Sequence, residues 1–142
     1  MKKVLALLCF CAAGLASHAE SATWTTDYQA ALAQAKTQNR HVMLFFTGSD
    51  WCGWCKKLNK EILTTTEFSK FAAEKLILVE LDFPRSKAQP AAVKAQNAKL
   101  QEKFKIEGYP TVIVLDSAGK KVGELGYQEG GPQPFVEALS KM

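Results

Sequence analysis

The stretch VMLFFTGSDWCGWCK, residues 42–56, joins five apolar residues to a polar turn and then to two closely spaced cysteines. The apolar run, Val42–Phe46, has the length and composition of a strand that is buried on both faces. The glycine, serine and aspartate at 48–50 are turn-forming residues. Cys52 and Cys55 then lie three residues apart at the predicted start of a helix. This order places two thiols just beyond the end of a buried strand.

Two thiols in this position are suited to redox chemistry. The thiolate is the reactive form of cysteine, and the free N–H groups and dipole at a helix N-terminus favour negative charge. Cys55 lies almost one turn after Cys52, so both sulfurs can meet on one side of the helix. Cys52 can attack a substrate disulfide, and Cys55 can resolve the mixed disulfide without any cofactor. Trp51 and Trp54 would offer apolar contact to an extended or unfolded protein.

The other two cysteines, Cys9 and Cys11, lie in a segment with the pattern of a secretory signal peptide. Two lysines open it, an apolar run follows over 4–16, and small residues stand just before position 20. The run is shorter than the roughly 20 apolar residues of a membrane span, although a retained signal anchor is the alternative. We therefore expect residues 1–19 to be removed, leaving one periplasmic or secreted domain over 20–142.

Charge and ligand counts argue against several other classes of protein. The formal charge of +4 falls to +2 without the two N-terminal lysines, and no basic stripe with interleaved aromatics suggests nucleic acid. Zinc normally needs four ligands, and the mature chain offers two cysteines and His41. Haem attachment needs a histidine directly after the second cysteine, where Lys56 stands. We expect no metal and no cofactor; a purely structural disulfide is the alternative, although so short a ring constrains little chain.

The rest of the chain alternates between helical and strand patterns. Thr25 or Thr26 can cap a helix that runs to about Gln38. Asp116–Gly119 is a hairpin turn, so the last two strands are expected to be antiparallel. The other predicted elements are strands over 76–81, 111–115 and 121–127, helices over 52–63, 67–74 and 91–104, and a closing helix that contains 135–139. This order predicts an α/β domain in which helices flank a mixed central sheet.

A second motif, Gly-Tyr-Pro-Thr at 108–111, precedes the strand over 111–115. Together with Trp-Cys-Gly-Trp-Cys-Lys at 51–56, it resembles the thioredoxin superfamily over essentially the whole mature chain. The run FTGSDWC, residues 46–52, is similar to secreted bacterial thioredoxin-like proteins. Their layout is that of the catalytic domains of periplasmic disulfide-interchange proteins and of small disulfide-isomerase-like domains. The resemblance implies a thioredoxin-like three-layer sandwich.

The resemblance also implies roles for individual residues. Cys52 would attack the substrate, Cys55 would resolve the mixed disulfide, and the two would form a redox-active disulfide. Pro110 would follow a cis peptide bond and hold the backbone of Tyr109 against the dithiol, where a substrate can pair with it as a short strand. The residues expected to contact substrate or support the site are Trp51, Gly53, Trp54, Tyr109 and Pro110.

One position departs from the thioredoxin pattern. Thioredoxins carry a buried aspartate about six residues before the first cysteine, and here that position is Phe46, or Phe45 with a one-residue gap. The proton acceptor for Cys55 must then come from elsewhere. Glu80 is the candidate, because burial in an apolar strand raises the pKa of a carboxyl group; the alternative is an edge or surface position without a role. Asp50 is expected to cap the helix or shape the turn.

These observations predict a secreted thiol–disulfide oxidoreductase that acts on proteins carrying disulfides or thiols. Gly53 resembles the reducing members and favours a reductase, which would need an electron donor, expected to be a membrane protein. A disulfide isomerase or oxidase, and a non-catalytic binding or chaperone-like module, are the alternatives. The stretch 83–96 is longer than the thioredoxin pattern requires and either extends a helix beside the site or decorates the surface. We expect a monomer.

Overall fold

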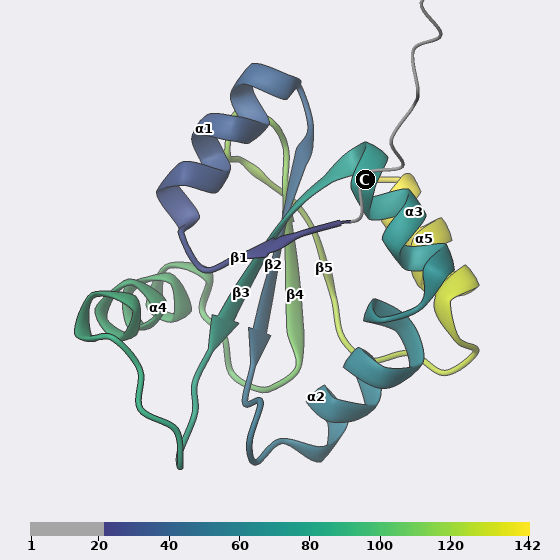
Figure 1. The fold of residues 1–142 in the computed structure, drawn as a ribbon. Helices are drawn as coiled ribbons and strands as arrows, with labels where there is room; N and C mark the ends of the chain where they lie inside the picture. Colours follow the sequence, from purple (N-terminus) through teal and green to yellow (C-terminus); the bar gives the residue numbers. More distant parts are fainter. Residues whose placement is uncertain (1–21) are drawn as a thin grey trace, which may run out of the picture.

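A five-stranded sheet lies at the centre of the computed structural model, which describes residues 22–142 (Figure 1). The strand order is β1-β3-β2-β4-β5. The central strand β2 (His41–Thr47) pairs in parallel with β3 (Leu76–Asp82) and antiparallel with β4 (Thr111–Leu115). At the edges, β1 (Trp24–Thr25) runs parallel to β3, and β5 (Lys121–Leu125) runs antiparallel to β4. The predicted mixed sheet and its final hairpin are confirmed.

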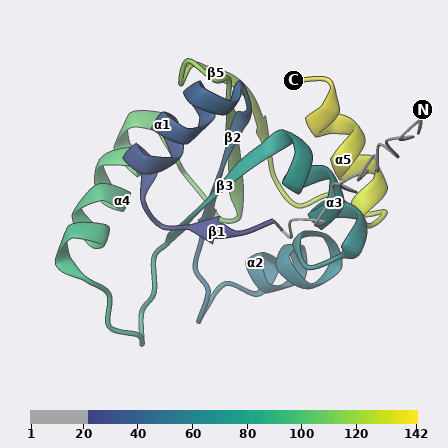
Figure 2. The same ribbon diagram turned by 45° about the horizontal axis from the view of Figure 1, so that its top comes forward.

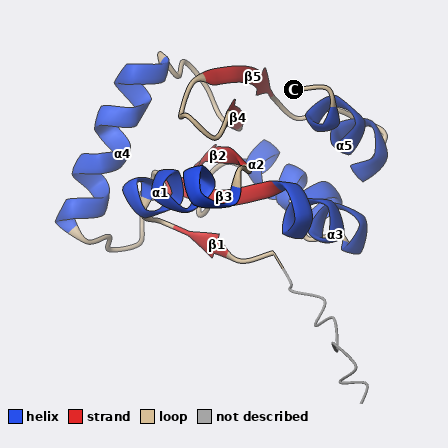
Figure 3. Cartoon of the chain, turned by 90° about the horizontal axis from the view of Figure 1, so that it is seen from above, coloured by secondary structure: helices blue, strands red, loops and turns tan. Residues whose placement is uncertain are grey.

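Helices cover both faces of this sheet and give the predicted three layers. The helices α1 and α4 lie on one side, and α2, α3 and α5 lie on the other (Figure 2, Figure 3). Their bounds are α1 Tyr28–Gln38, α2 Gly53–Leu58, α3 Thr66–Lys75, α4 Ala91–Phe104 and α5 Pro132–Ser140. A π-helical turn, η1 (Asn59–Leu63), continues α2.

The alternation of β2 divides the core into two parts. Val42, Leu44 and Phe46 pack in the cluster beneath α1 and α4, while Met43 and Phe45 pack in the cluster beneath α2, α3 and α5. All five are buried, which explains why this strand reads as a continuous apolar run. The cysteines belong to the second cluster, so Phe45, and not Phe46, lies on the face of the sheet that carries the active site.

The expectation that Thr25 or Thr26 caps the first helix is wrong. Thr25 pairs with β3 as part of β1, and its hydroxyl accepts a hydrogen bond from the Asp27 amide at 3.1 Å. Asp27 is the N-cap of α1, where its carboxylate accepts from the Ala30 amide at 2.9 Å. A two-residue edge strand has no pattern of its own in the sequence, because its stability comes from the neighbouring strand.

Two other boundaries differ from the predictions. The helix expected over 52–63 widens into η1, where the amide and hydroxyl of Thr64 both donate to the carbonyl of Asn59 at 3.0 Å. The last strand ends at Leu125, two residues earlier than expected. The predicted signal peptide, residues 1–19, lies outside the described residues. Within 22–142, no helix combines the length and apolar character that crossing a membrane requires.

Candidate active site

Cys52 and Cys55 form a disulfide at the N-terminus of α2, with a Cα–Cα distance of 5.3 Å. Cys52 is the N-cap residue, and its Sγ accepts a hydrogen bond from the Cys55 amide at 3.2 Å. Cys52 is 6% exposed and Cys55 is 1% exposed. The sulfur of Cys52 therefore lies at the positive end of a helix, where an anion is favoured. Gly53 begins the helix, and a Cβ there would meet open space.

The turn before the disulfide is tied to the neighbouring strand. The Ser49 amide and hydroxyl donate to the Asp82 carboxylate at 2.9 and 2.6 Å. The Cys52 amide donates to the Gly48 carbonyl at 2.8 Å. A Cβ on Gly48 would lie 2.3 Å from the Trp51 ring, so the absence of a side chain lets the indole cross the turn. Together these contacts fix the conformation of the turn that leads into α2.

Trp51 forms the wall between the turn and the loop that contains Pro110. Its indole Nε1 donates to the Phe83 carbonyl at 2.8 Å. Its ring meets that of Tyr109 edge-on, with 5.7 Å between the ring centres. The Tyr109 hydroxyl accepts a hydrogen bond from the side-chain amide of Gln101 at 2.8 Å. The peptide bond between Tyr109 and Pro110 is cis, as expected. The two sequence motifs, more than fifty residues apart, are thus brought into contact through Trp51 and Tyr109.

Trp54 is the large apolar side chain that the site exposes most, at 57%. Its ring packs against that of Tyr127, with 5.3 Å between the ring centres. The Lys57 ammonium lies 5.1 Å from the centre of the Trp54 ring and 4.9 Å from that of Tyr127. The Tyr127 hydroxyl donates to the Glu61 carboxylate, which raises the pKa of Tyr127. Trp54 was expected at the site, whereas Tyr127 and Glu61 were not, because no local pattern in the sequence links them to it.

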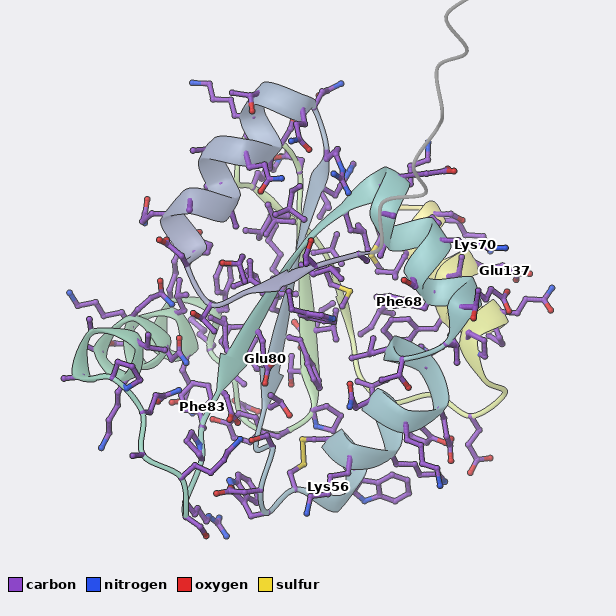
Figure 4. All side chains as sticks on the ribbon, viewed as in Figure 1. Lys56, Phe68, Lys70, Glu80, Phe83 and Glu137 are labelled. Atoms are coloured by element: carbon purple, nitrogen blue, oxygen red, sulfur yellow. A yellow bond between two sulfur atoms is a disulfide. The ribbon has the colours of Figure 1, made fainter. Side chains whose placement is uncertain are left out.

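Glu80 and Cys55 line the same cavity, whose volume is about 260 Å³. Glu80 pairs with Phe45 across β2 and β3, so its side chain lies on the active-site face of the sheet. Burial raises the pKa of the Glu80 carboxyl, the charge of Asp82 adds to the rise, and Lys87 opposes it. Figure 4 draws Glu80 and Lys56 at the same end of the sheet, with the disulfide beside Lys56. Glu80 on β3 thus lies opposite Phe45 on β2, which stands at the position of the buried aspartate of thioredoxins.

Asp50 does not cap α2, since Cys52 holds that position. The Asp50 carboxylate instead accepts backbone N–H bonds from Arg85, Ser86 and Lys87 at 2.7–3.2 Å. The amides of Arg85 and Ser86 are the main reason that the pKa of Asp50 lies below its ordinary value. Asp50 thereby fastens the long loop after β3 to the active-site turn.

Metal binding has no visible site in the described part of the chain. Among residues 22–142, no three His, Cys, Asp or Glu side chains gather as they would around an ion. A cysteine sulfur at a helix N-terminus is an arrangement that favours the thiolate, which is the reactive form in thiol–disulfide exchange.

Residues 28–142 match the family described as the thioredoxin-like domain. The chain belongs to this family. It is 37% identical over 113 residues to the disulfide bond reductase DsbH of Chlamydia pneumoniae, a match that covers 80% of this chain and 68% of DsbH. It is 35% identical over 107 residues to the thioredoxin-related protein DsbJ of the same organism, covering 75% of this chain but only 31% of DsbJ.

A solved structure described as the DsbH oxidoreductase superimposes with a TM-score of 0.81 at 35% identity, and the match covers 86% of this chain and 84% of that one. The disulfide at the start of α2 has the Cys-x-x-Cys spacing of thiol–disulfide exchange. The protein is therefore an enzyme of the thiol–disulfide oxidoreductase type.

Proposed function

We propose that this enzyme reduces protein disulfides, with Cys52 as the attacking cysteine. The observation that carries the exchange chemistry is the N-cap position of Cys52, whose sulfur accepts a hydrogen bond from the Cys55 amide at 3.2 Å. The direction is proposed from DsbH, the 37% identical relative that is named a disulfide bond reductase. A hydrogen bond to sulfur and the helix dipole both favour the thiolate over the thiol. A stable thiolate in the reduced enzyme is the form that attacks a substrate disulfide.

Reduction then takes two exchange steps. The Cys52 thiolate attacks one sulfur of the substrate disulfide, an enzyme–substrate S–S bond forms, and the other substrate sulfur leaves as a thiolate. Cys55 next loses its proton and attacks the Cys52 sulfur, which forms the Cys52–Cys55 disulfide and releases the second substrate sulfur. Two electrons pass from enzyme to substrate, and the two departing sulfurs take up two protons.

Glu80 is proposed to accept the proton of Cys55 in the second step. Burial disfavours a thiolate, and Cys55 is almost fully buried, so its attack needs a base. Glu80 lines the same cavity, which is large enough for water molecules to join the two groups. Its raised pKa makes the carboxylate a better proton acceptor than an exposed glutamate.

Substrate is proposed to bind as an extended segment across the rim of the site. Trp54 offers an exposed apolar surface, and Trp51 and Tyr109 form a wall on the other side. The cis bond before Pro110 turns the chain immediately ahead of β4, and we assign the backbone of Tyr109 to pairing with the substrate. Gly53 leaves open space beside the attacking sulfur.

The direction of the reaction is proposed from a named relative, and the compartment from the N-terminal sequence. DsbH, the 37% identical relative, is named a disulfide bond reductase, and Gly53 resembles the reducing members of the superfamily. A signal peptide over residues 1–19 would place the enzyme in the periplasm. Each turnover would oxidise the Cys52–Cys55 dithiol, so we propose a membrane protein as the electron donor that reduces it again. We also propose that the enzyme works as a monomer.

This proposal is tested by measuring insulin reduction by wild type and by Cys52→Ala in the presence of a dithiol reductant. Wild type is expected to precipitate the insulin chains, and the variant to do so no faster than the reductant alone. Equal inactivity of the two would favour a non-catalytic binding module. The redox equilibrium of the Cys52–Cys55 pair against glutathione tests the direction: a potential near that of thioredoxin, about −270 mV, supports a reductase, and one near −120 mV indicates an oxidase.

A further inference from the structure

Two tryptophan–cation pairs flank the disulfide, one on each side. The Arg85 guanidinium lies 3.8 Å from the centre of the Trp51 ring, and the Lys57 ammonium lies 5.1 Å from that of Trp54. Arg85 is on the loop after β3, the stretch that is longer than the thioredoxin pattern requires. Because cations gather at the rim of a site that takes up protein segments, they bear on which segments bind.

The two sides differ in how their positive charge is compensated. On the Trp54 side, contact with Tyr127 is the main cause that raises the pKa of Lys57, and the charges of Glu61 and Glu129 add to the rise. On the Trp51 side, the Asp50 carboxylate binds three backbone N–H groups, and the Asp82 carboxylate is bonded to Ser49 and paired with Lys87. Across residues 22–142, the Arg85 guanidinium has neither a hydrogen bond nor an ion pair. Lys57 has no ion pair among these residues either, but Tyr127 beneath it binds the Glu61 carboxylate, so the charge of Lys57 is the better compensated of the two.

Asp50 brings two cations to this side. Its carboxylate holds the backbone at Arg85, and its carbonyl accepts from the Lys56 ammonium at 3.3 Å. Asp50 stands two residues before Cys52, so both cations are anchored to the active-site turn itself. Lys87, the next cation along the loop, is paired with Asp82 at 3.4 Å and adds less free charge.

Arg85 rests on a support that is held rigidly. The Trp51 ring is fixed by its hydrogen bond to the Phe83 carbonyl and by its edge-on contact with Tyr109. A guanidinium that stacks through its face keeps the N–H donors along its edge free, and this edge matches the two oxygens of a carboxylate. Pre-organisation lowers the entropy that binding would otherwise cost.

We propose that Arg85, with Lys56, binds a carboxylate that the substrate carries close to its reactive cysteine, so that the enzyme prefers disulfides within acidic segments. The proposal rests on the reductase function proposed above and adds the class of substrate. The occupant is an extended protein segment with an aspartate or glutamate near the cysteine, and the charge of the Trp51 side selects it.

The test compares two peptides that share a disulfide and differ only in carrying glutamates or lysines beside one cysteine. The reduced enzyme is mixed with each peptide, and the second-order rate constant is followed by tryptophan fluorescence. Wild type is expected to favour the glutamate peptide, and the preference should shrink as salt is added. Arg85→Gln should lower the ratio of the two rate constants about three- to fivefold, the size of one exposed charge pair.

Lys70→Gln is the matched control, because it removes the same charge from α3, away from the active-site end of the sheet (Figure 4). It should leave the ratio unchanged, and Arg85→Lys should retain part of the preference. Thermal unfolding of the oxidised variants checks that each one folds. The inference is overturned if Arg85→Gln keeps the wild-type ratio, or if both glutamine variants lower it equally. Failure of wild type to reduce either peptide would instead reject the proposed function itself.

Discussion

Replacement of Glu80 by glutamine removes the proposed proton acceptor while keeping the shape of its side chain. Glu80 lines the cavity that also contains Cys55, and it stands opposite Phe45 in the sheet register. The attack of Cys52 on substrate does not use this carboxylate. Only the second step, the attack of Cys55 on the mixed disulfide, is expected to slow.

The size of the effect follows from what can replace the carboxylate. A positioned base typically contributes about 10²–10⁴-fold to the rate of a proton transfer. A cavity of about 260 Å³ can admit several water molecules, so water can accept the proton in place of Glu80, although it is a weaker base. We therefore expect the lower end of the range, a loss of about 10²-fold near pH 7.

The pH profile identifies the group that is responsible. In wild type, resolution should slow as the pH falls through the pKa of Glu80, which burial raises above the ordinary glutamate value. In Glu80→Gln the rate should instead climb about tenfold per pH unit, because only the ionised Cys55 thiol can attack. The two profiles should converge at high pH, where the thiol ionises without help.

Stopped-flow mixing with a peptide disulfide measures both steps. Resolution is read from release of the second thiol, and attack is read from mixed-disulfide formation in a Cys55→Ala background. Glu67→Gln, on the exposed side of α3, is the matched control. A wild-type resolution rate in Glu80→Gln at every pH would refute the reasoning. Equal slowing of the attack step would show that Glu80 acts on Cys52 instead.

Four further outcomes are expected. Glu80→Gln should be more stable than wild type at pH 7 and equally stable at acidic pH, because the raised pKa means that the half-buried carboxylate is disfavoured once ionised; urea unfolding at several pH values measures this. Gly48→Ala should cost about 1–3 kcal/mol and slow insulin reduction, because the new Cβ would displace Trp51; urea unfolding and fluorescence report it. Phe68→Ala should cost about 3–5 kcal/mol in urea unfolding, since the ring is fully buried. Trp54→Ala should change stability by no more than about 0.5 kcal/mol yet raise the KM for insulin.

Each of these expectations has an opposing result. A stability gain from Glu80→Gln that persists at acidic pH would point to better packing and not to charge. Unchanged fluorescence and stability in Gly48→Ala would mean that the turn accommodates a methyl group. A small loss in Phe68→Ala would mean that α3 and α5 can close around the cavity. An unchanged KM in Trp54→Ala would remove this indole from substrate binding.

The main elements of the fold were predictable because their signals are local. The continuous apolar run of β2 indicated a strand buried on both faces, and both faces of the sheet are covered by helices. Asp116–Gly119 indicated the hairpin that joins β4 and β5. The two-residue strand β1 and the π-helical turn η1 were missed, because the first depends on its partner strand and the second on the hydrogen bonds of Thr64.

In the site, as in the fold, the features with a local signal in the sequence were predictable and the contacts between distant segments were not. Alternation along β3 places Glu80 with Leu78, but only the packing of α2 against the sheet puts that face toward Cys55. The contact between Tyr127 and Glu61 joins residues 66 positions apart. No periodicity in a sequence encodes such a pairing, since it arises only when distant segments pack together.

The spacing of Cys52 and Cys55 within one helical turn is a property of the chain alone, because helix geometry sets how far apart they lie. The surroundings of that pair come from folding. Asp50 holds the amide of Ser86, 36 residues away, and Arg85 comes to rest on Trp51 because of it. A thiol pair can therefore be recognised from its local spacing, whereas its proton acceptor and its charged rim depend on contacts that form only when the chain closes on itself.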